Sequence, residues 1–316
     1  MIPRSFGRWA ARSLALLVLG LAGSAWARDP CRVCRISAKS ADGRETMHAT
    51  FVRPLQPANG VPQRIVVLLH GLGGDATSWL QVQQVRDRFD AAMRSGALPP
   101  TTLLIPDGGD GYWSDWADGR RHDATLVVRL VELLEARMDA QQRSPGARHA
   151  VVGASMGGFG ALSIALQRPD VFEVAVGLSA TDLEIAATEA PNRPVYRNVL
   201  GQAPWTAILA RINPVQLVRG GAGKGQQFWL GWGSAEPRKF AEGGRLLVEA
   251  MTAAGLNVTN RVIDGGSHGW DSTWNQLHPW WLDGLIARWR PKTVRAPTAA
   301  TAAAAGRAAP TTRTVP

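Results

Sequence analysis

The stretch VVGASMGGFG at residues 151–160 sets the interpretation of the whole chain. A compact apolar run leads into the pattern Gly-x-Ser-x-Gly, centred on Ser155, and residues 161–166 continue in a pattern typical of a helix. This order predicts a strand, a sharp turn and a helix, with glycines where a Cβ atom would collide with neighbouring backbone. A serine at such a turn projects its hydroxyl from the end of a sheet. Ordinary glycine-rich turns share the pattern, but the flanking strand and helix favour a nucleophilic serine.

Length and composition are those of a folded globular protein. The chain has 316 residues, of which 45% are hydrophobic and 19% charged, enough for one large α/β domain or two small ones. The net charge of +10 is partly carried by basic residues in segments 1–27 and 291–316, which contain no acidic residue. The small, scattered positive charge that remains argues against a nucleic-acid surface.

The first 27 residues have the features of an export signal. Three arginines precede an apolar run at residues 14–22, and Ala25-Trp26-Ala27 supplies the small residues that a signal peptidase needs. A membrane anchor is the alternative, but the apolar run is too short to span a bilayer comfortably. We therefore expect a secreted or periplasmic protein that starts at Arg28 and has no stable membrane insertion after cleavage.

Only two cysteines exist, Cys31 and Cys34. In an oxidising compartment this pair is expected to close a small disulfide near the new N-terminus. A redox pair or half of a zinc site is the alternative, but no second ligand pair and no βαβ context accompany the two cysteines.

Apolar runs and helical patterns alternate along residues 28–290, which we interpret as one α/β catalytic domain. Residues 181–225 break this regularity, because prolines interrupt short helical pieces, and we interpret them as an insertion over the functional face. Residues 291–316 are rich in Ala, Thr and Pro and are predicted to be disordered. Besides the strand before Ser155, strands are expected at 31–38, 45–53, 64–69, 101–105, 174–178, 227–232 and 257–263, and helices at about 79–93, 123–140, 237–254 and 271–290.

A nucleophilic serine needs a base, and in a strand–turn–helix hydrolase that base follows the serine in the chain. Only two histidines, His268 and His278, lie after Ser155. His268 occupies a glycine-flanked loop after a predicted strand, where an imidazole reaches over the end of the sheet. His278 precedes Pro279 in the last helical region, so His268 is the predicted base.

The base needs an acid that orients its ring. Glu236 follows the predicted strand at 227–232, which is the expected place, and Asp182 after the preceding strand is the competitor. A carboxylate at a helix start is the structural alternative for Glu236. Asp264 and Asp271 are close to His268 in sequence, but this proximity does not orient a ring nitrogen. The predicted acid is Glu236.

Three motifs in this order resemble the putative esterase family of α/β-hydrolases, which includes esterase D, feruloyl and acetylxylan esterases, and the antigen 85 mycolyltransferases. They are HGLGGD at residues 70–75, GASMGG at 153–158 and GSHGW at 266–270, and the resemblance covers about residues 40–290. It implies an α/β-hydrolase fold, with a mostly parallel central sheet and helices on both faces.

The resemblance also implies roles for individual residues. Ser155 would be the nucleophile and His268 the base, and the backbone N–H groups of Leu72 and Met156 would form the oxyanion hole. Family members often have Gly-Thr-Glu-Asp where this chain has Gly-Ser-Ala-Glu, so the last position, Glu236, departs from the usual aspartate. His70 would be a structural residue of the oxyanion loop.

The expected activity is that of a serine carboxylic-ester hydrolase that forms an acyl-enzyme on Ser155 and needs no metal or organic cofactor. Its expected partner is a small-molecule, carbohydrate or lipid ester. An acyltransferase of the antigen 85 kind would use the same residues, and a non-catalytic binding protein on a hydrolase scaffold is the alternative from another class.

Several aromatic and acidic residues around the expected site are candidate ligand-binding groups. Trp113, Trp116 and Trp270 are candidates to line an acyl or aromatic pocket, although a packing role would explain each of them. The aspartates at positions 107, 110 and 115 do not have the spacing of a calcium loop, so turn formation is the expected role of Asp107, Asp110 and Asp115.

Overall fold

The computed structural model describes residues 32–54, 63–80, 82–138 and 146–291. The predicted signal peptide at 1–27, Cys31 and all of the predicted tail except Pro291 lie outside these residues. The proposed disulfide therefore stays a prediction. Cys34 itself lies on the first strand of the sheet and is buried.

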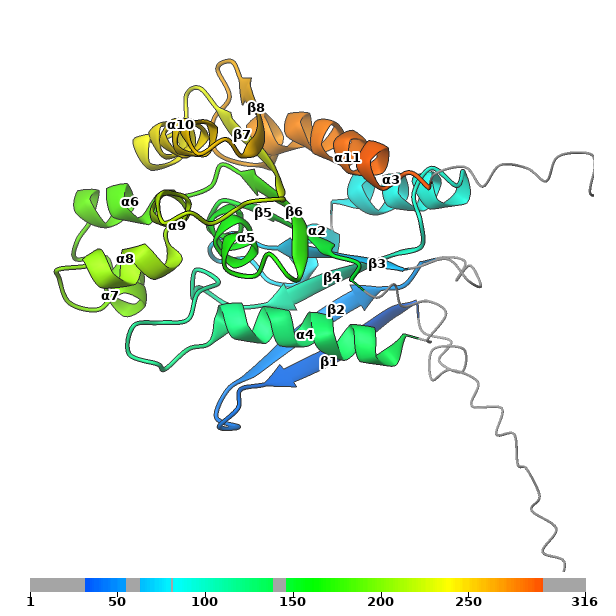
Figure 1. The fold of residues 1–316 in the computed structure, drawn as a ribbon, viewed down its shortest axis with the longest axis horizontal. Helices are drawn as coiled ribbons and strands as arrows, with labels where there is room; N and C mark the ends of the chain where they lie inside the picture. Colours follow the sequence, from blue (N-terminus) through cyan, green and yellow to red (C-terminus); the bar gives the residue numbers. More distant parts are fainter. Residues whose placement is uncertain (1–31, 55–62, 81, 139–145, 292–316) are drawn as a thin grey trace, which may run out of the picture.

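A mostly parallel sheet of eight strands runs through the domain, in the order β1-β2-β4-β3-β5-β6-β7-β8 (Figure 1). The first two strands are antiparallel to their neighbours, and the other six are parallel to one another. The strands are β1 (Val33–Lys39), β2 (Thr46–Val52), β3 (Arg64–Leu69), β4 (Thr101–Asp107), β5 (His149–Ala154), β6 (Phe172–Leu178), β7 (Gln227–Gly233) and β8 (Asn257–Ile263).

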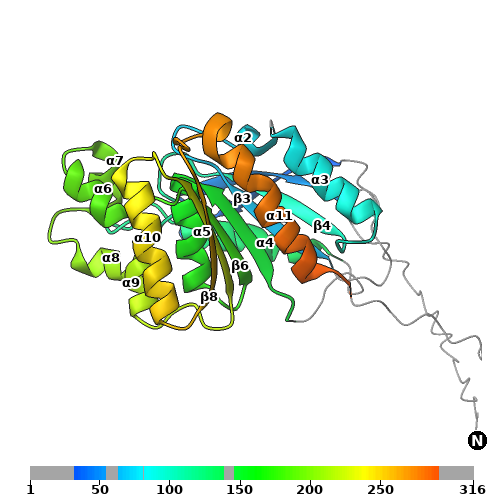
Figure 2. The same ribbon diagram turned by 90° about the horizontal axis from the view of Figure 1, so that it is seen from above.

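Helices cover both faces of this sheet, as Figure 2 shows. The larger of two apolar clusters joins one face to α4 (Asp123–Arg137), α5 (Met156–Gln167) and α10 (Arg238–Ala253). The smaller cluster joins the opposite face to α3 (Gln83–Arg94) and α11 (Asn275–Trp289). The expected architecture, a mostly parallel sheet between two helical layers, is confirmed.

The central strands are apolar at successive positions because both of their faces are covered. Every residue of β5 is buried, and Val151 packs into the larger cluster while Val152 packs into the smaller one. The pleat of the strand sends neighbouring side chains to opposite faces, which explains why the sequence before Ser155 shows no polar alternation.

Two predicted helices are divided in the structure. The helix expected at 79–93 consists of α2 (Thr77–Leu80) and α3, and the helix expected at 271–290 begins as a π-helical turn, η1 (Trp270–Trp274), before α11. The helix expected at 123–140 is α4, which ends earlier, at Arg137, because Met138 has an extended backbone.

The predicted insertion contains the short helices α6 (Leu183–Glu189), α7 (Pro194–Leu200), α8 (Thr206–Ile212) and α9 (Pro214–Arg219). Proline opens both α7 and α9, where its missing N–H group costs nothing.

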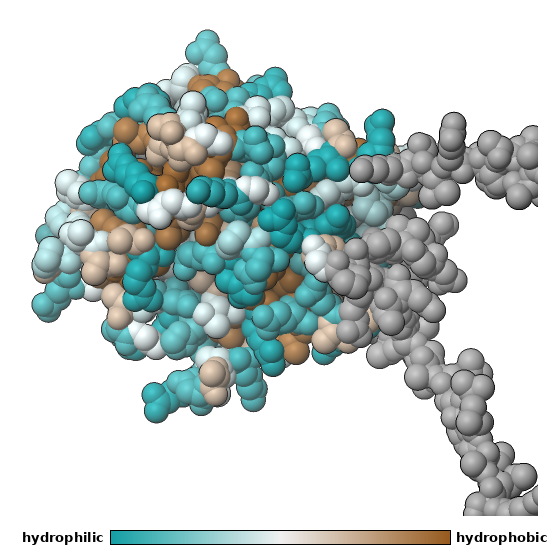
Figure 3. All heavy atoms as spheres, in the orientation of Figure 1, coloured by the Kyte–Doolittle hydropathy of each residue, from teal (hydrophilic) through white to brown (hydrophobic). Residues whose placement is uncertain are grey.

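Polar side chains cover most of the face drawn in Figure 3, and apolar side chains there occur in small groups. In the described part of the chain, no helix combines the length and the apolar character needed to cross a membrane. Leu72 is one of the few large hydrophobic side chains that are exposed among the described residues, and it lies at the site described next.

Candidate active site

Ser155 occupies a strained turn between β5 and α5. Its φ of 59° and ψ of −119° are unfavourable for a residue with a side chain, and such strain persists only where the surroundings enforce it. Two glycines make the turn sterically feasible. A Cβ atom on Gly153 would lie 2.0 Å from the carbonyl oxygen of Gly157, and one on Gly157 would lie 2.2 Å from that of Leu69. The turn thus holds the serine hydroxyl at the end of β5.

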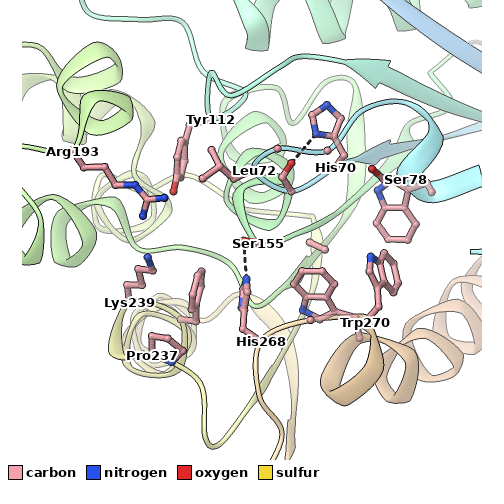
Figure 4. Close-up of a pocket in the computed structure, with 18 residues that line it drawn as sticks. His70, Leu72, Ser78, Tyr112, Ser155, Arg193, Pro237, Lys239, His268 and Trp270 are labelled. Atoms are coloured by element: carbon pink, nitrogen blue, oxygen red, sulfur yellow. Dashed lines mark hydrogen bonds between the residues drawn. The ribbon is translucent and has the colours of Figure 1, made fainter. Parts of the chain in front are cut away.

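The structure brings Ser155, His268 and Glu236 together at this end of the sheet (Figure 4 labels the first two). His268 Nε2 lies 2.9 Å from Ser155 Oγ, and His268 Nδ1 lies 3.2 Å from Glu236 Oε2. A carboxylate only accepts hydrogen bonds, so the ring proton belongs on Nδ1. Nε2 is then free to accept the proton of the serine hydroxyl, which is the arrangement that general-base catalysis requires.

The carboxylate of Glu236 is held on its other side as well. Its Oε1 accepts hydrogen bonds from Ser179 Oγ at 2.6 Å and from the backbone N–H of Gly233 at 3.0 Å. Ser179 Oγ in turn accepts from Trp274 Nε1 at 2.8 Å. The side chain of Glu236 is fully buried, so these bonds set its direction without competition from water.

None of the motifs in the sequence indicates that Ser179 and Trp274 support the acid. Ser179 follows β6, whose end lies at the same edge of the sheet as the ends of β5 and β7, and its φ of 48° is again unusual for a non-glycine residue. Its place directly after a predicted strand was the available signal.

Aromatic rings fix the plane of the His268 imidazole. Phe240, in the first turn of α10, stacks on it with ring centroids 3.9 Å apart, and Trp274 meets it edge-on at 5.0 Å. These contacts leave the ring little freedom to turn away from Ser155.

The competing residues lie elsewhere. Asp182 caps α6, where its side chain accepts from the backbone N–H of Ile185, and burial raises its pKa above the ordinary value. His278 is buried on α11 beside Trp281, and neither of its ring nitrogens has a hydrogen-bond partner among the described residues. Asp264 accepts from Ser234 Oγ at 3.3 Å.

The two residues assigned to the oxyanion hole flank Ser155. Met156 is the first residue of α5, a position whose backbone N–H has no partner within the helix. Leu72 lies in the loop after β3, and a Cβ atom on the preceding Gly71 would lie 3.5 Å from Ser155 Cβ. Asp110 braces this loop, because its Oδ1 accepts from the backbone N–H of Gly73 at 2.7 Å.

His70 supports the same loop through hydrogen bonds of both ring nitrogens. Its Nδ1 lies 2.8 Å from the carbonyl oxygen of Gly71, and its Nε2 accepts from the N–H of Gly108 at 3.3 Å. Burial lowers the pKa of His70, which favours the neutral ring that this pair of bonds requires. His70 thus has the contacts of a structural residue.

The three tryptophans considered for a pocket have different surroundings. Trp270 lines the pocket and meets Trp79 edge-on at 5.0 Å. Trp113 is 1% exposed, packs against the His70 ring and donates to the His70 carbonyl. It therefore supports the Leu72 loop and does not line the pocket. Trp116 donates to the carbonyl of Gly111 and is absent from the pocket lining.

Of the three aspartates whose spacing excludes a calcium loop, Asp110 and Asp115 stabilise loops, and Asp107 is the exposed last residue of β4. Asp110 braces the Leu72 loop as described, and Asp115 accepts from the backbone N–H and the hydroxyl of Thr125 in the first turn of α4. Within the residues that the structure describes, no group of three or more His, Cys, Asp or Glu side chains is arranged to hold a metal ion.

Ser155 opens into a pocket of about 560 Å³. Figure 4 shows Ser78 and Trp270 on one side of it and Tyr112, Arg193 and Lys239 on the other. Trp79, whose ring meets Trp270 edge-on, also lines the pocket. The hydroxyl of Ser155 lies between these two sides, so an ester bond placed there would extend one half of its molecule into each.

A strained serine at a strand–turn–helix junction, a histidine and a buried carboxylate at the carboxyl edge of a parallel sheet define the α/β-hydrolase class. The chain belongs to the putative esterase family, whose model matches residues 40–283. Membership in this family supports the hydrolytic cleavage of esters.

Several solved structures share this fold. A ferulic acid esterase matches with a TM-score of 0.61 and 19% identity over 81% of this chain and 98% of its own. An S-formylglutathione hydrolase from Agrobacterium tumefaciens matches with a TM-score of 0.62 and 20% identity over 81% of this chain and 94% of its own. MPT51 from Mycobacterium tuberculosis matches with a TM-score of 0.62 and 18% identity over 82% of this chain and 99% of its own. At these identities the similarity shows the shared fold.

Proposed function

We propose that this protein is a secreted or periplasmic serine esterase that works through an acyl-enzyme on Ser155. The observation that carries the proposal is the continuous hydrogen-bonded arrangement of Ser155, His268 and Glu236 on a strained turn. A structural serine would need neither the strain nor a histidine oriented by a buried carboxylate.

In the proposed reaction, Ser155 Oγ attacks the ester carbonyl while its proton passes to His268 Nε2. The backbone N–H groups of Met156 and Leu72 bind the oxyanion, and Glu236 stabilises the imidazolium that forms. His268 then donates the proton to the leaving alcohol, which leaves the acyl group on Ser155. A water molecule, deprotonated by the same ring, releases the acid and restores the serine.

Substitution of Ser155 tests this mechanism. Ser155→Ala is expected to lower kcat/KM on 4-nitrophenyl acetate by at least about 1,000-fold, because the nucleophile is lost. The wild-type protein should show a burst of 4-nitrophenol and react with a fluorophosphonate at Ser155, identified by mass spectrometry of the labelled peptide. Ser37→Ala, which removes an exposed hydroxyl on β1 away from the site, is the matched control. Full activity in the Ser155→Ala protein would exclude the mechanism.

Transfer to an alcohol is a separate outcome of the same experiment. Adding a sugar or glycerol acceptor and analysing the products distinguishes hydrolysis from transfer. Transfer that outruns hydrolysis would make the protein an acyltransferase.

Export and the disulfide are tested on the mature protein. N-terminal sequencing of protein recovered outside the cytoplasm should begin at Arg28, following the small residues at positions 25–27. Mass spectrometry of the non-reduced protein should find Cys31 joined to Cys34. An intact N-terminus on cytoplasmic protein would contradict the export proposal.

A further inference from the structure

One side of the pocket carries two positive charges and no negative one. Arg193 and Lys239 are the only Arg or Lys side chains among the lining residues, and the described lining contains no Asp or Glu. Arg193 precedes α7 in the insertion, whereas Lys239 lies in the first turn of α10. Two segments that are distant in the sequence therefore bring cations to the same place.

Aromatic groups hold both cations in position. The Arg193 guanidinium lies 5.6 Å from the ring centroid of Tyr196, and Lys239 Nζ lies 3.5 Å from the hydroxyl of the same tyrosine. Lys239 Nζ also lies 5.1 Å from the ring centroid of Phe240. Tyr196 and Phe240 are buried, so their rings are held in place by packing and restrict the positions of the two charged groups.

Neither cation forms an ion pair with a carboxylate within the described ranges. The contrast with the neighbouring Arg238 is direct, since Arg238 pairs with Glu242 and lies 3.6 Å from Glu189. Carboxylates are thus present near this surface, but they neutralise the arginine outside the pocket. The charges of Arg193 and Lys239 remain available to a ligand.

These cations are close to the reacting groups. Lys239 adjoins Phe240, whose ring stacks on the imidazole of His268. Figure 4 shows Arg193, Tyr112 and Lys239 together on one side of Ser155, opposite Trp270. A substrate whose carbonyl lies at Ser155 would therefore direct one of its halves toward the two cations.

We infer that the substrate is an ester with an anionic oxygen group, a carboxylate or a phosphate, on the half that faces Arg193 and Lys239. The inference deepens the proposed esterase function and rests on it. Bringing two positive charges together costs free energy in the empty pocket, and an anion between them removes this repulsion. Guanidinium and ammonium groups also donate strong hydrogen bonds to such oxygens.

Two matched substrate pairs test the inference and locate the charge. For the acyl half, 4-nitrophenyl adipate monoester is compared with neutral 4-nitrophenyl hexanoate. For the alcohol half, 4-acetoxybenzoate is compared with its neutral methyl ester. In one pair, the anionic ester is expected to have a kcat/KM about tenfold higher than the neutral ester, and added salt should reduce this ratio.

Substitutions identify the groups responsible. Arg193→Gln and Lys239→Gln are each expected to lower the anionic-to-neutral ratio of kcat/KM about 3- to 10-fold. Arg238→Gln removes the same charge one residue away, outside the pocket, and is expected to keep the wild-type ratio. If the neutral ester is favoured in both pairs, or if all three variants keep the same ratio, the inference is overturned while the esterase proposal stands.

A binding measurement separates this inference from the proposed function. Adipate is titrated calorimetrically into wild type and the three glutamine variants. Binding should weaken in Arg193→Gln and Lys239→Gln and persist in Arg238→Gln. Absence of hydrolysis with every ester would defeat the esterase proposal, and equal binding to all four proteins would defeat the anion site.

Discussion

Both oxygens of the Glu236 carboxylate have assigned partners. Oε2 faces His268, whereas Oε1 accepts from Ser179 and from the Gly233 backbone. Glu236 directly precedes Pro237 in the loop after β7, and a residue before proline has a restricted backbone. The direction of the imidazole therefore depends in part on the hydroxyl of Ser179, whose hydrogen bonds go to Glu236 and Trp274.

Ser179 is predicted to act as a positioning residue. Ser179→Ala removes one bond to Glu236 and leaves the buried Trp274 Nε1 without its acceptor, so kcat should fall about tenfold. KM should change less than twofold, because the hydroxyl does not line the pocket. Steady-state kinetics and a thermal midpoint measure both effects. A wild-type kcat, or a loss that merely follows the folded fraction, would contradict this role.

At the scale of elements, the nucleophile depends on how closely α5 approaches the ends of two strands. Gly157 in its first turn lies against the carbonyl oxygens of Leu69 and His70, and Gly158 lies against that of Leu178. A side chain there would push the helix away from the sheet. The position of Ser155 relative to the Leu72 loop follows from this close contact.

Two alanine substitutions compare crowded and open glycine positions near Ser155. Gly157→Ala places a Cβ atom 2.2 Å from a backbone oxygen, and it should lower stability by about 2 kcal/mol or more and activity by about 100-fold. Gly71→Ala makes only ordinary contacts at 3.5 Å, and its stability should stay within about 1 kcal/mol of wild type. Urea unfolding and ester hydrolysis measure the two effects. Equal behaviour of the variants would refute the steric explanation.

At the scale of the whole molecule, the sheet order brings the site together. Strands β5, β6, β7 and β8 are consecutive parallel neighbours, so the loops that follow them meet at one edge. Those loops carry Ser155, Ser179, Glu236 and His268. The helical layer that carries α3 and α11 supplies Trp274 to this site and also contains the buried His278.

His278 is predicted to make folding stability depend on pH. Burial, with a smaller effect from Arg88, lowers its pKa to about 4 from an ordinary value of 6.5. The unfolded chain therefore binds more protons between these values, and stability should decrease as pH falls from about 6.5 to 4. The contribution of this one residue approaches about 3 kcal/mol.

His278→Leu removes the proton-binding group and two buried ring nitrogens without partners in the described chain. Its unfolding free energy should therefore exceed that of wild type at pH 4 by more than it does at pH 7. Chemical unfolding at several pH values measures the difference. A constant difference between the two proteins would show that His278 does not titrate as expected.

Local patterns were sufficient to predict much of this protein. The glycine spacing around Ser155, the apolar runs before each functional loop and the glycine-flanked His268 all reflect requirements within a few residues of chain. The sheet, its helical layers and the family followed from these patterns. The divided helices at α2–α3 and η1–α11 did not, because apolar spacing continues across both breaks.

The sequence by itself determined the order of strands and helices along the chain. It also determined which residues follow the strands, since backbone geometry at those positions depends on near neighbours. Only the tertiary structure decided that Ser179 and Trp274 hold Glu236, that Trp113 is buried while Trp270 faces the pocket, and that Arg193 and Lys239 share one side of it. Such contacts join segments far apart in the chain. They depend on the order of strands in the sheet and on the path of the insertion, which no local pattern specifies.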